Sequence, residues 1–427
     1  MKFNKWTVAL AAVGVVSLAS AAKAEEKASS VMTALSSTTI SGYVDTSAEW
    51  NPGTGNANLP PYKFNSPSKA DGFNLDVVQL RIEKPLDESE WAAGYRVDLW
   101  AGPDANTLNT VSTGTHGDFA VRQAYVALRT PVGNGIDWKM GVFDSVLGYE
   151  SVEAGANPNF TRSYGHSIEP QTHTGILASY RFSDLVSASV GVANTMGPVI
   201  NSRDFAPVQG TNPYAESYKT YMGSIAITAP ESMGFLSGST LYGGVVNGYN
   251  NSVAFSPGVS PTVAAFAAPS LNAYVGTTVA TPVTGLRVGA AWDMLSINTT
   301  PHGPLPPGVV AGTKTEGEIW TVSGYASYQA TEKLSLHGRF EYATGDVDHP
   351  AYTRGTIPPG TLAGDLLDNA IYSATATVQY DLWKNVISRL EFRWDRSEHG
   401  NLFGGTVTGA PDRENAYLLA ANVIYKF

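Results

Sequence analysis

The chain of 427 residues contains no cysteine. Disulfides are therefore excluded, as are sites that need a thiolate, and a thiol-free chain suits passage through an oxidising periplasm. Long hydrophobic runs are also missing, because beyond the N-terminus no stretch of about eighteen apolar residues could form a transmembrane helix. Charged residues make up only 15% of the chain, and 37 acids outnumber 27 bases. This composition is poor in charge for a soluble surface, and its acidic balance argues against binding to nucleic acid.

The N-terminus has the three parts of a secretory signal peptide. Lys2 and Lys5 give a positive start, residues 6–22 are apolar, and Ala22-Lys23-Ala24 fits a small-residue cleavage site. The apolar core is short for a membrane-spanning helix. We therefore expect cleavage after Ala24, which removes three lysines and changes the formal net charge from −10 to −13. The alternative is an uncleaved membrane anchor.

The most frequent pattern in the chain is a period of two. In residues 415–427, every second residue from Tyr417 to Phe427 is apolar or aromatic, and the positions between include Asn422 and Lys426. This is the spacing of a strand with one apolar face. Sixteen such segments occur, most of them at least as long as the roughly nine to eleven residues that a tilted strand needs to cross a bilayer. They cover 38–50, 73–84, 91–101, 118–129, 137–144, 172–182, 186–195, 218–229, 238–248, 270–280, 285–296, 317–329, 333–343, 369–380, 385–396 and 415–427.

Short and long connections alternate between these segments. The long ones include 51–72, 145–171, 249–269 and 344–368. One tight rim and one elaborated rim are typical of outer-membrane barrels, with short periplasmic turns and long outer loops. An open sheet edge in hydrocarbon would leave backbone groups unpaired. We therefore predict an all-β fold, a closed antiparallel up-and-down transmembrane β-barrel of about sixteen strands over 38–427.

The segment before the barrel, residues 25–37, is expected to be periplasmic, with a brief helix as one expectation. Aromatic residues are expected at both rims of the barrel, where strands meet lipid headgroups. Those at the short-turn ends are Trp91, Tyr328, Tyr380, Trp383 and Phe427, and those near the long loops are Trp50, Trp292, Tyr342 and Trp394. The terminal phenylalanine would then contact lipid at the periplasmic rim.

The opposite face of many strands carries charges of both signs. A barrel of sixteen strands encloses an aqueous lumen, so we expect these residues to line a water-filled passage. The predicted pore-lining residues are Arg81, Glu83, Arg96, Asp98, Arg129, Arg287, Asp293, Arg339, Glu341, Arg389, Glu391, Arg393 and Asp395. For any one pair the alternative is an ion pair that only stiffens the wall. Arg129 is the least decided, because the other face of its strand, which holds Arg122, has nearly the same claim to point inward.

The connection 145–171 is long, and it is rich in aromatic, proline and polar residues. Loops of this length are usually functional or disordered, and disordered segments are poor in aromatics. We expect an ordered constriction loop that folds into the lumen, with its acids facing the arginines of the wall. The residues assigned to it are Asp144, Tyr149, Glu150, Glu153, Arg162 and His166. The alternative is an outer loop that packs over a neighbour.

This region also carries a family resemblance. The stretch GVFDSVLGYESVEAGANPNFTRSYGHSIEPQTHTG, residues 141–175, resembles the Gly-x-Phe-x-x-x-x-Gly-Tyr-Glu, Asn-x-x-Phe/Tyr-Ser/Thr-Arg-Ser and Thr-His-Thr-Gly segments of the putative beta-barrel porin-2, OmpL-like family. TTISGYVDTSAEWN and VRQAYVAL resemble its first strand and its Gln-Ala-Tyr strand. The resemblance spans essentially the whole mature chain, and it implies a porin-like barrel with no particular solute.

Catalytic motifs are missing from the sequence, which has no H-E-x-x-H, P-loop or G-x-S-x-G. We predict no catalytic residue, no cofactor and no metal site, and we interpret Asp346 and Asp348 beside His349 as solvated loop residues. The function that we expect is a passive diffusion porin for small hydrophilic solutes or ions in the bacterial outer membrane. The alternatives are a substrate-specific channel for a sugar or small anion, a structural or adhesive barrel acting through its outer loops, and a secreted soluble β-rich protein.

The expected partners follow from this hypothesis. They are outer-membrane lipid, small hydrophilic solutes and the barrel assembly machinery, which the resemblance implies would recognise the C-terminal strand ending at Phe427. Porins of this size suggest a homotrimer by analogy. Nucleic acid is not expected.

Overall fold

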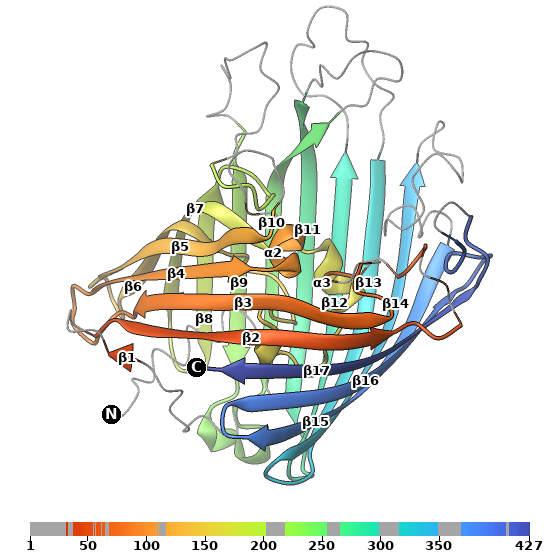
Figure 1. Ribbon diagram of the computed structural model, residues 1–427. Coiled ribbons are helices and arrows are strands. Elements are labelled where there is room, and N and C mark those ends of the chain that lie inside the picture. The colour runs from red at the N-terminus through yellow and green to blue at the C-terminus, as the bar shows by residue number, and fades with distance from the viewer. Residues whose placement is uncertain are drawn as a thin grey trace, which may run out of the picture.

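The computed structural model is a closed β-barrel with short turns at one rim and long connections at the other (Figure 1). The C-terminus lies at the short-turn rim. No helix among the described residues is both long and apolar enough to cross a membrane. The structure describes residues 31–32, 37–53, 55, 57–60, 62–64, 68–108, 110, 117–201, 218–253, 265–298, 316–348, 369–406 and 410–427.

Sixteen long strands form the ring, each antiparallel to its neighbours. The pairing of β17 with β2 joins the two ends of the chain and closes the barrel. No strand of this ring therefore has an open edge, as burial in hydrocarbon requires. The strands are β2 Thr39–Trp50, β3 Gly72–Lys84, β4 Ala93–Ala101, β5 Phe119–Thr130, β6 Ile136–Asp144, β7 Thr172–Arg181, β8 Val186–Ala193, β9 Thr220–Thr228, β10 Thr240–Val253, β11 Ala265–Ala280, β12 Leu286–Asn298, β13 Glu316–Gln329, β14 Leu334–Asp348, β15 Asn369–Trp383, β16 Val386–Ser397 and β17 Asn415–Lys426.

All sixteen predicted segments are strands, but several run longer than predicted. β10 continues to Val253 and β11 begins at Ala265, where the sequence predicts a long loop over 249–269. Val253 of β10 and Ala265 of β11 still pair with each other in the antiparallel ladder. The alternation of apolar residues ends earlier than the strands do, because backbone pairing with a neighbour continues a hairpin whatever its side chains are.

The helix expected within residues 25–37 is wrong for Val31–Met32, which form the short strand β1. β1 pairs with Ile40 and Thr39 of β2, beyond the point where β17 stops pairing at Tyr43. It therefore supplies hydrogen-bond partners to a stretch of β2 that β17 leaves open. The proposed signal peptide and most of the rest of this segment lie outside the described residues.

The outward face of the barrel is apolar. Along β17 the predicted face is exposed and the other face is buried, so that Leu419 is 39% exposed and its neighbour Leu418 only 1%. The same is true of exposed apolar residues on other strands, among them Phe340, Leu390 and Val275. The aromatic residues predicted at the rims include Trp91, 72% exposed, and Trp50, 64% exposed. An apolar belt between aromatic rims is the surface that a bilayer solvates.

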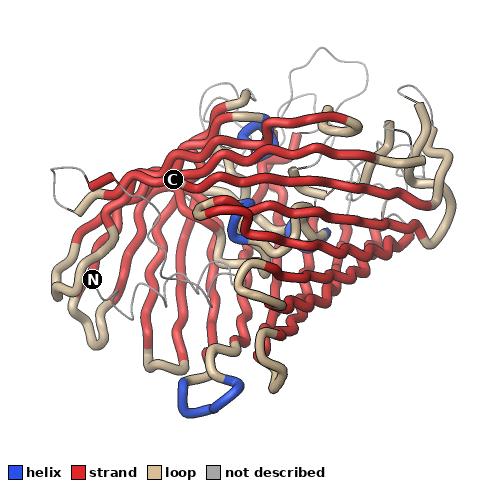
Figure 2. The backbone as a smooth tube through the Cα atoms, turned by 60° about the horizontal axis from the view of Figure 1, so that its bottom comes forward, coloured by secondary structure: helices blue, strands red, loops and turns tan. Residues whose placement is uncertain are grey.

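In the described part of the chain four short helices interrupt the connections, and Figure 2 shows helices in blue. η2 Glu231–Leu236 lies at the short-turn rim. The other three are α2 Pro103–Leu108, η1 Ala154–Ala156 and α3 Tyr164–Ile168. α2 packs on β3, β4 and β5, and α3 packs on β12, β13 and β14. Long connections therefore fold back onto the inner wall of the ring.

Candidate functional site: the loop-filled lumen

Residues 145–171, which we call the inner loop, lie inside the barrel. The loop hydrogen-bonds inward side chains on β10, β11, β14, β15, β16 and β17, and it forms ion pairs with β3, β4 and β5. Only a segment that crosses the lumen can contact opposite walls in this way. The predicted inward folding of this connection agrees with its contacts.

Two glycines of the sequence motif shape the approach to the inner loop. Gly141 and Gly148 have φ angles of 135° and 115°, in the region that side chains disfavour. Space is lacking as well, since a Cβ on Gly141 would lie 2.3 Å from the carbonyl oxygen of Ala124, and one on Gly148 would lie 2.6 Å from Glu169 Oε2. The motif glycines are therefore required by the backbone at the point where the chain leaves β6.

Six inward charged residues on β14 and β16 form what we call the β14–β16 patch. They are Arg339, Glu341, Arg389, Glu391, Arg393 and Asp395. Each is at most 4% exposed, because the inner loop covers them. These residues were expected to line an open aqueous passage. Their side chains do point inward, but they contact the inner loop and not open water.

Arg339 is the hub of this patch. Its guanidinium forms ion pairs with Glu150 of the inner loop at 2.8 Å and with Glu341 at 2.7 Å. It also donates to the carbonyl oxygens of Thr161 at 2.8 Å and Arg162 at 3.2 Å. A planar group with five donors suits this convergence of acceptors.

Glu391 is a negatively charged wall residue that binds the same part of the inner loop as Arg339 does, around Thr161. It accepts the backbone N–H of Phe160 at 2.6 Å and of Thr161 at 2.9 Å. The hydroxyls of Thr161 and Thr377 donate to it at 2.6 and 2.7 Å. Four donors compensate the burial of one carboxylate, which would otherwise be costly.

Arg393 and Arg389 complete the attachment to this wall. Arg393 donates to the carbonyl oxygen of Arg162 at 2.7 Å, and its guanidinium lies 3.9 Å from the ring centroid of Tyr62. Arg389 donates to the carbonyl oxygen of Asn157 at 2.5 Å. Wall arginines thus hold the loop largely through its backbone.

A second charged cluster, which we call the β3–β5 patch, consists of Arg81, Arg96, Asp98 and Arg122. Glu153 of the inner loop pairs with Arg81, with Arg96 at 3.1 Å and with Arg122 at 3.6 Å. Burial alone would raise the pKa of Glu153, but the nearby arginines hold its pKa below the usual value. The acids of the loop were expected to face wall arginines; Glu150 pairs with Arg339, Glu153 with Arg81, and Asp144 with Arg122.

Arg122 was left undecided by the sequence, and a β-bulge explains why. The register of β4 and β5 shifts between Asp98 and Leu99, so that Gln123 pairs with Asp98 and Val121 with Leu99. Both Arg122 and Gln123 are buried and bond Asp98, at 2.8 and 3.1 Å. A bulge puts two consecutive residues opposite one, which strict alternation does not anticipate. Arg122 also pairs with Asp144 at 2.7 Å.

The inner loop meets a different surface on β8–β11, which we call the charge-free arc because these four strands contain no Lys, Arg, Asp or Glu. Val146 and Leu147 belong to a buried apolar cluster here that includes Met222 and Tyr242. Tyr149 stacks on Tyr325 of β13 at 4.0 Å between ring centroids. Apolar packing dominates this side of the loop, with a few neutral hydrogen bonds.

The C-terminal part of the inner loop holds a pair of buried carboxyls. Glu169 and Asp293 of β12 are both buried, and they lie close enough for the charge of Asp293 to act on Glu169. Burial, and then the nearness of Asp293, raises the pKa of Glu169 well above its usual range. His166 Nδ1 lies 3.7 Å from Glu169, but burial and the cations Arg162 and Lys63 lower its pKa. A shared proton is the physical way for two buried carboxyls to remain in contact.

The remaining predicted residues lie nearer the short-turn rim of the barrel. Arg129 pairs with Asp137 at 2.6 Å near a short turn. Arg287 donates to the carbonyl oxygen of Gly238 at 2.9 Å. Glu83 is half-buried on the inward face of β3. The structure therefore does not gather all the predicted lining residues into one site.

Sequence reasoning missed a second segment inside the lumen, residues 62–64 and 68–70 of the first long connection. Lys69 forms ion pairs at 2.6 Å with both Asp76 of β3 and Asp104 of α2. Burial raises the pKa of Asp104 to about 6, although Lys69 acts to lower it. The signal available in the sequence was Tyr62 and Phe64 in a connection otherwise expected to be exposed.

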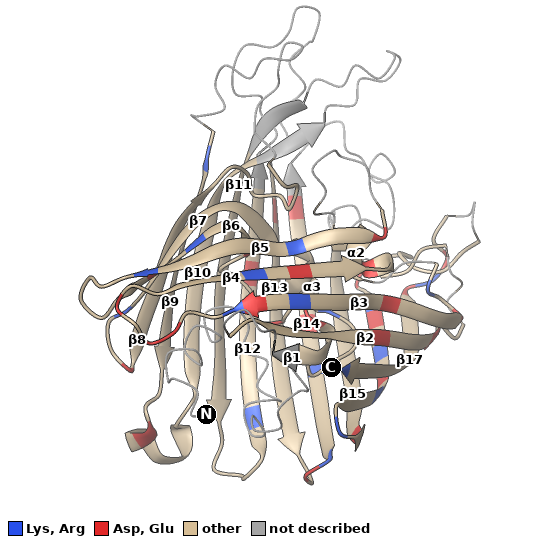
Figure 3. Cartoon of the chain, turned by 60° about the vertical axis from the view of Figure 1, so that its left-hand side comes forward, with Lys and Arg blue, Asp and Glu red and all other residues tan. Residues whose placement is uncertain are grey.

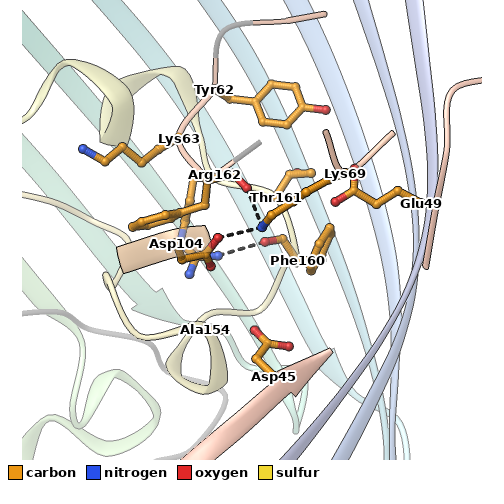
Figure 4. A pocket seen from close by; sticks show the side chains of 11 residues that line it. Asp45, Glu49, Tyr62, Lys63, Lys69, Asp104, Ala154, Phe160, Thr161 and Arg162 are labelled. Carbon is orange, nitrogen blue, oxygen red and sulfur yellow. Dashed lines mark hydrogen bonds and ion pairs between the residues drawn. The ribbon is translucent and has the colours of Figure 1, made fainter. Parts of the chain in front are cut away.

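This first connection and the inner loop enclose a small crevice against β2 (Figure 4). Its volume is about 20 Å³. That is enough for one water-sized species. Asp45 and Glu49 of β2 line it, as do Tyr62 and Lys69. We call this cavity the loop crevice.

A protein-family model matches residues 37–427, and its description is putative beta-barrel porin-2, OmpL-like. The chain belongs to this family. This porin is therefore an outer-membrane channel. Its barrel fold and its outward apolar belt are consistent with that function. A search of the curated proteins finds no significant match.

The barrel of this porin is similar to solved outer-membrane structures. OmpT of Vibrio cholerae has a TM-score of 0.54 at 9% identity, covering 93% of this chain and 100% of that one. DcaP of Acinetobacter baumannii, an outer-membrane channel, has a TM-score of 0.54 at 14% identity, with coverage of 91% and 97%. An anion-selective porin from Comamonas acidovorans has a TM-score of 0.55 at 10% identity, with coverage of 92% and 99%. Identities this low establish the shared fold alone.

Proposed function

We propose that this porin is a passive diffusion channel for small hydrophilic solutes or ions, with residues 145–171 as its constriction loop. The observation that carries the proposal is the attachment of the inner loop to two charged patches on different arcs of the wall. A loop held by Arg339, by Glu391 and by the ion pairs of Glu153 with Arg81 and Arg96 would narrow the passage to a fixed width. Charged residues held around a narrow passage are how such channels select solutes.

The test is the conductance of the purified, folded protein in planar lipid bilayers. Discrete steps that grow in proportion to salt concentration support free diffusion. A protein that is correctly folded, inserts into the bilayer and gives no steps would contradict the proposal. That outcome would favour a structural or adhesive barrel acting through its outer loops.

A substrate-specific channel is the second candidate. The observation that favours it is the extent of the inner loop's attachment, because a loop fixed by Arg339, Glu391 and Arg393 presents one constant surface to a solute. Saturable uptake of one class, such as a sugar or a small anion, or blockade of the current by it, would distinguish this candidate from free diffusion.

We further propose export to the outer membrane with cleavage after Ala24. The N-terminal pattern and the family support this proposal. The mass of the protein extracted from outer membranes tests it, since a mature chain would begin at Glu25. Recognition by the barrel assembly machinery through the strand ending at Phe427 belongs to the same proposal. Deletion of Phe427 should then lower the amount of assembled barrel.

We also propose that the porin is a homotrimer without enzymatic activity. One similar structure is described as a trimer form of OmpT from Vibrio cholerae, which supports the assembly. Its TM-score is 0.54 at 11% identity, so the fold is all that the two share by that comparison. Mass measurement of the detergent-solubilised protein, corrected for bound detergent, would distinguish one copy from three.

A further inference from the structure

The loop crevice contains a carboxylate oxygen that has no direct partner among the described residues. Glu49 is 3% exposed, and its Oε2 has no hydrogen-bond partner in the described part of the chain. Glu49 and Asp45 also form no ion pair with any described residue. Asp45 is 1% exposed and accepts a hydrogen bond from Asn422. A buried carboxylate without a partner is costly, so it requires either a proton or a cation.

Lys69 also lines the crevice, but other groups hold its ammonium. It donates hydrogen bonds to Asp104 at 2.6 Å and to the carbonyl oxygen of Phe64 at 3.0 Å. It also forms an ion pair with Asp76 at 2.6 Å, and no ion pair joins it to Glu49 among the described residues. Two carboxylates share this one positive charge, so Lys69 and its partners add a net negative charge beside the crevice.

The two other cations of the lining are directed elsewhere. Arg162 donates to the carbonyl oxygens of Ser151, Val152 and Phe160. The ammonium of Lys63 points away from Glu49 (Figure 4). Burial lowers the pKa of Lys63 to about 8, which weakens its charge near neutral pH.

A second unpartnered oxygen reaches the crevice from the first connection. The hydroxyl of Tyr62 has no hydrogen-bond partner among the described residues, and the residue is 3% exposed. In Figure 4 its ring extends toward the side on which Glu49 lies. Hard cations prefer oxygen ligands such as these. The cavity, about 20 Å³, has room for one small ion.

We propose that the loop crevice binds a single monovalent cation, with Glu49 as its charged ligand and the Tyr62 hydroxyl as a neutral one, and that this site makes the channel cation-selective. Asp45 precedes Glu49 by four residues on the same face of β2, about 13 Å along the strand, so it offers a second acidic position lower in the lumen. No group of three or more metal-ligating side chains occurs among the described residues, which favours a monovalent ion over a divalent one. The selectivity rests on the proposed channel function.

The first experiment is the reversal potential of the full-length porin in a planar bilayer under a gradient of KCl. Wild type should pass K⁺ in preference to Cl⁻, and Glu49→Gln should lower the permeability ratio by about fivefold, because it removes the charged ligand of the site. Glu49→Asp keeps the charge and should retain most of the selectivity. Equal reversal potentials for wild type and Glu49→Gln would overturn the proposal.

The matched control is Glu83→Gln, the same change on the inward face of the neighbouring strand and outside the crevice. It should change the permeability ratio much less than Glu49→Gln. An equal effect of the two substitutions would show that overall lumen charge, and not a site at Glu49, sets the selectivity, and it would overturn the assignment.

A second experiment does not depend on conduction. Crystals of the porin soaked in thallium(I) nitrate should show anomalous density beside Glu49 and the Tyr62 hydroxyl, and this density should be absent from Glu49→Gln. A crevice that holds only water in wild-type crystals would overturn the site. If wild type gave no conductance, the proposed channel function would fail, and thallium density would still decide the cation site.

Discussion

The inner loop is held by two unlike walls. The β14–β16 patch contacts it through six buried charged residues, and these bond mainly to its backbone. The charge-free arc of β8–β11 contacts it through packing around Val146 and Leu147. Figure 3 shows the same contrast, with β9 and β10 drawn in tan and charges gathered on β3, β4 and β5.

The contrast separates two physical tasks. Hydrogen bonds and ion pairs are directional, so the charged patches set the position and orientation of the loop. Apolar contacts have no direction, so the arc fills space and excludes water without fixing a register. Loss of one partner from a buried charged cluster leaves other charges unpaired, whereas loss of an apolar side chain leaves only a cavity.

The largest effect is expected from Arg339→Ala. It leaves Glu150 and Glu341 buried without their common partner, which should weaken attachment of the inner loop by about 3–5 kcal/mol. The single-channel conductance should rise, and trypsin should cut after Arg162, which is 3% exposed in the attached loop. Arg396→Ala on the outward face of β16 is the control and should change neither. Unchanged conductance in Arg339→Ala would contradict the role of the patch.

A smaller effect is expected from Tyr149→Ala on the apolar side of the loop. It removes the stack on Tyr325 and the hydrogen bond with Thr278. The cost should be about 2–3 kcal/mol, at the low end for loss of a large buried side chain. Trypsin cleavage after Arg162 should be slower than in Arg339→Ala, and Tyr221→Ala on the outward face is the control. Faster cleavage than in Arg339→Ala would reverse the ranking of the two walls.

The carboxyl pair of Glu169 and Asp293 should make loop attachment dependent on pH. The pKa of Glu169 is raised in the folded state, so its proton stabilises the attached loop. This stabilisation is complete when the pH is below the ordinary carboxyl pKa. It is lost as the pH rises through the raised pKa of the folded state. The loss is at most about 1.4 kcal/mol per pH unit. The titratable side chains that face the Glu169 carboxyl are Glu150, His166 and Asp293.

Single-channel conductance measured between pH 5 and pH 9 tests this expectation. It should increase with pH in wild type, because the loop is held less firmly, and Glu169→Gln should flatten the profile. A wild-type profile that falls with rising pH would show that another group controls the loop.

The smallest effect is expected from Asp137→Asn. This removes the pair with Arg129, which lies near a short turn. Partly exposed pairs contribute about 1 kcal/mol or less, and salt screens them. The urea midpoint should shift slightly and the conductance should stay unchanged. A conductance change would extend the charged attachment beyond the two patches.

Much of the barrel could be predicted from local sequence. The difference in exposure between Leu418 and Leu419 follows from the alternation of residues along β17, which the sequence shows directly. The expectation that loop acids meet wall arginines also needed only charge complementarity. The bulge that turns both Arg122 and Gln123 inward depends on the register between two strands, which single-strand patterns do not contain.

The sixteen strands and their inward and outward faces follow from the local pattern of residues, because each is set by the backbone geometry of a few neighbours. The covering of Arg339, Glu391 and Arg393 by the loop, and the unpartnered oxygen of Glu49 near Lys69, appear only in the folded molecule. Those outcomes depend on which side chains meet across the lumen, and that is settled by closure of the ring and not by any local pattern.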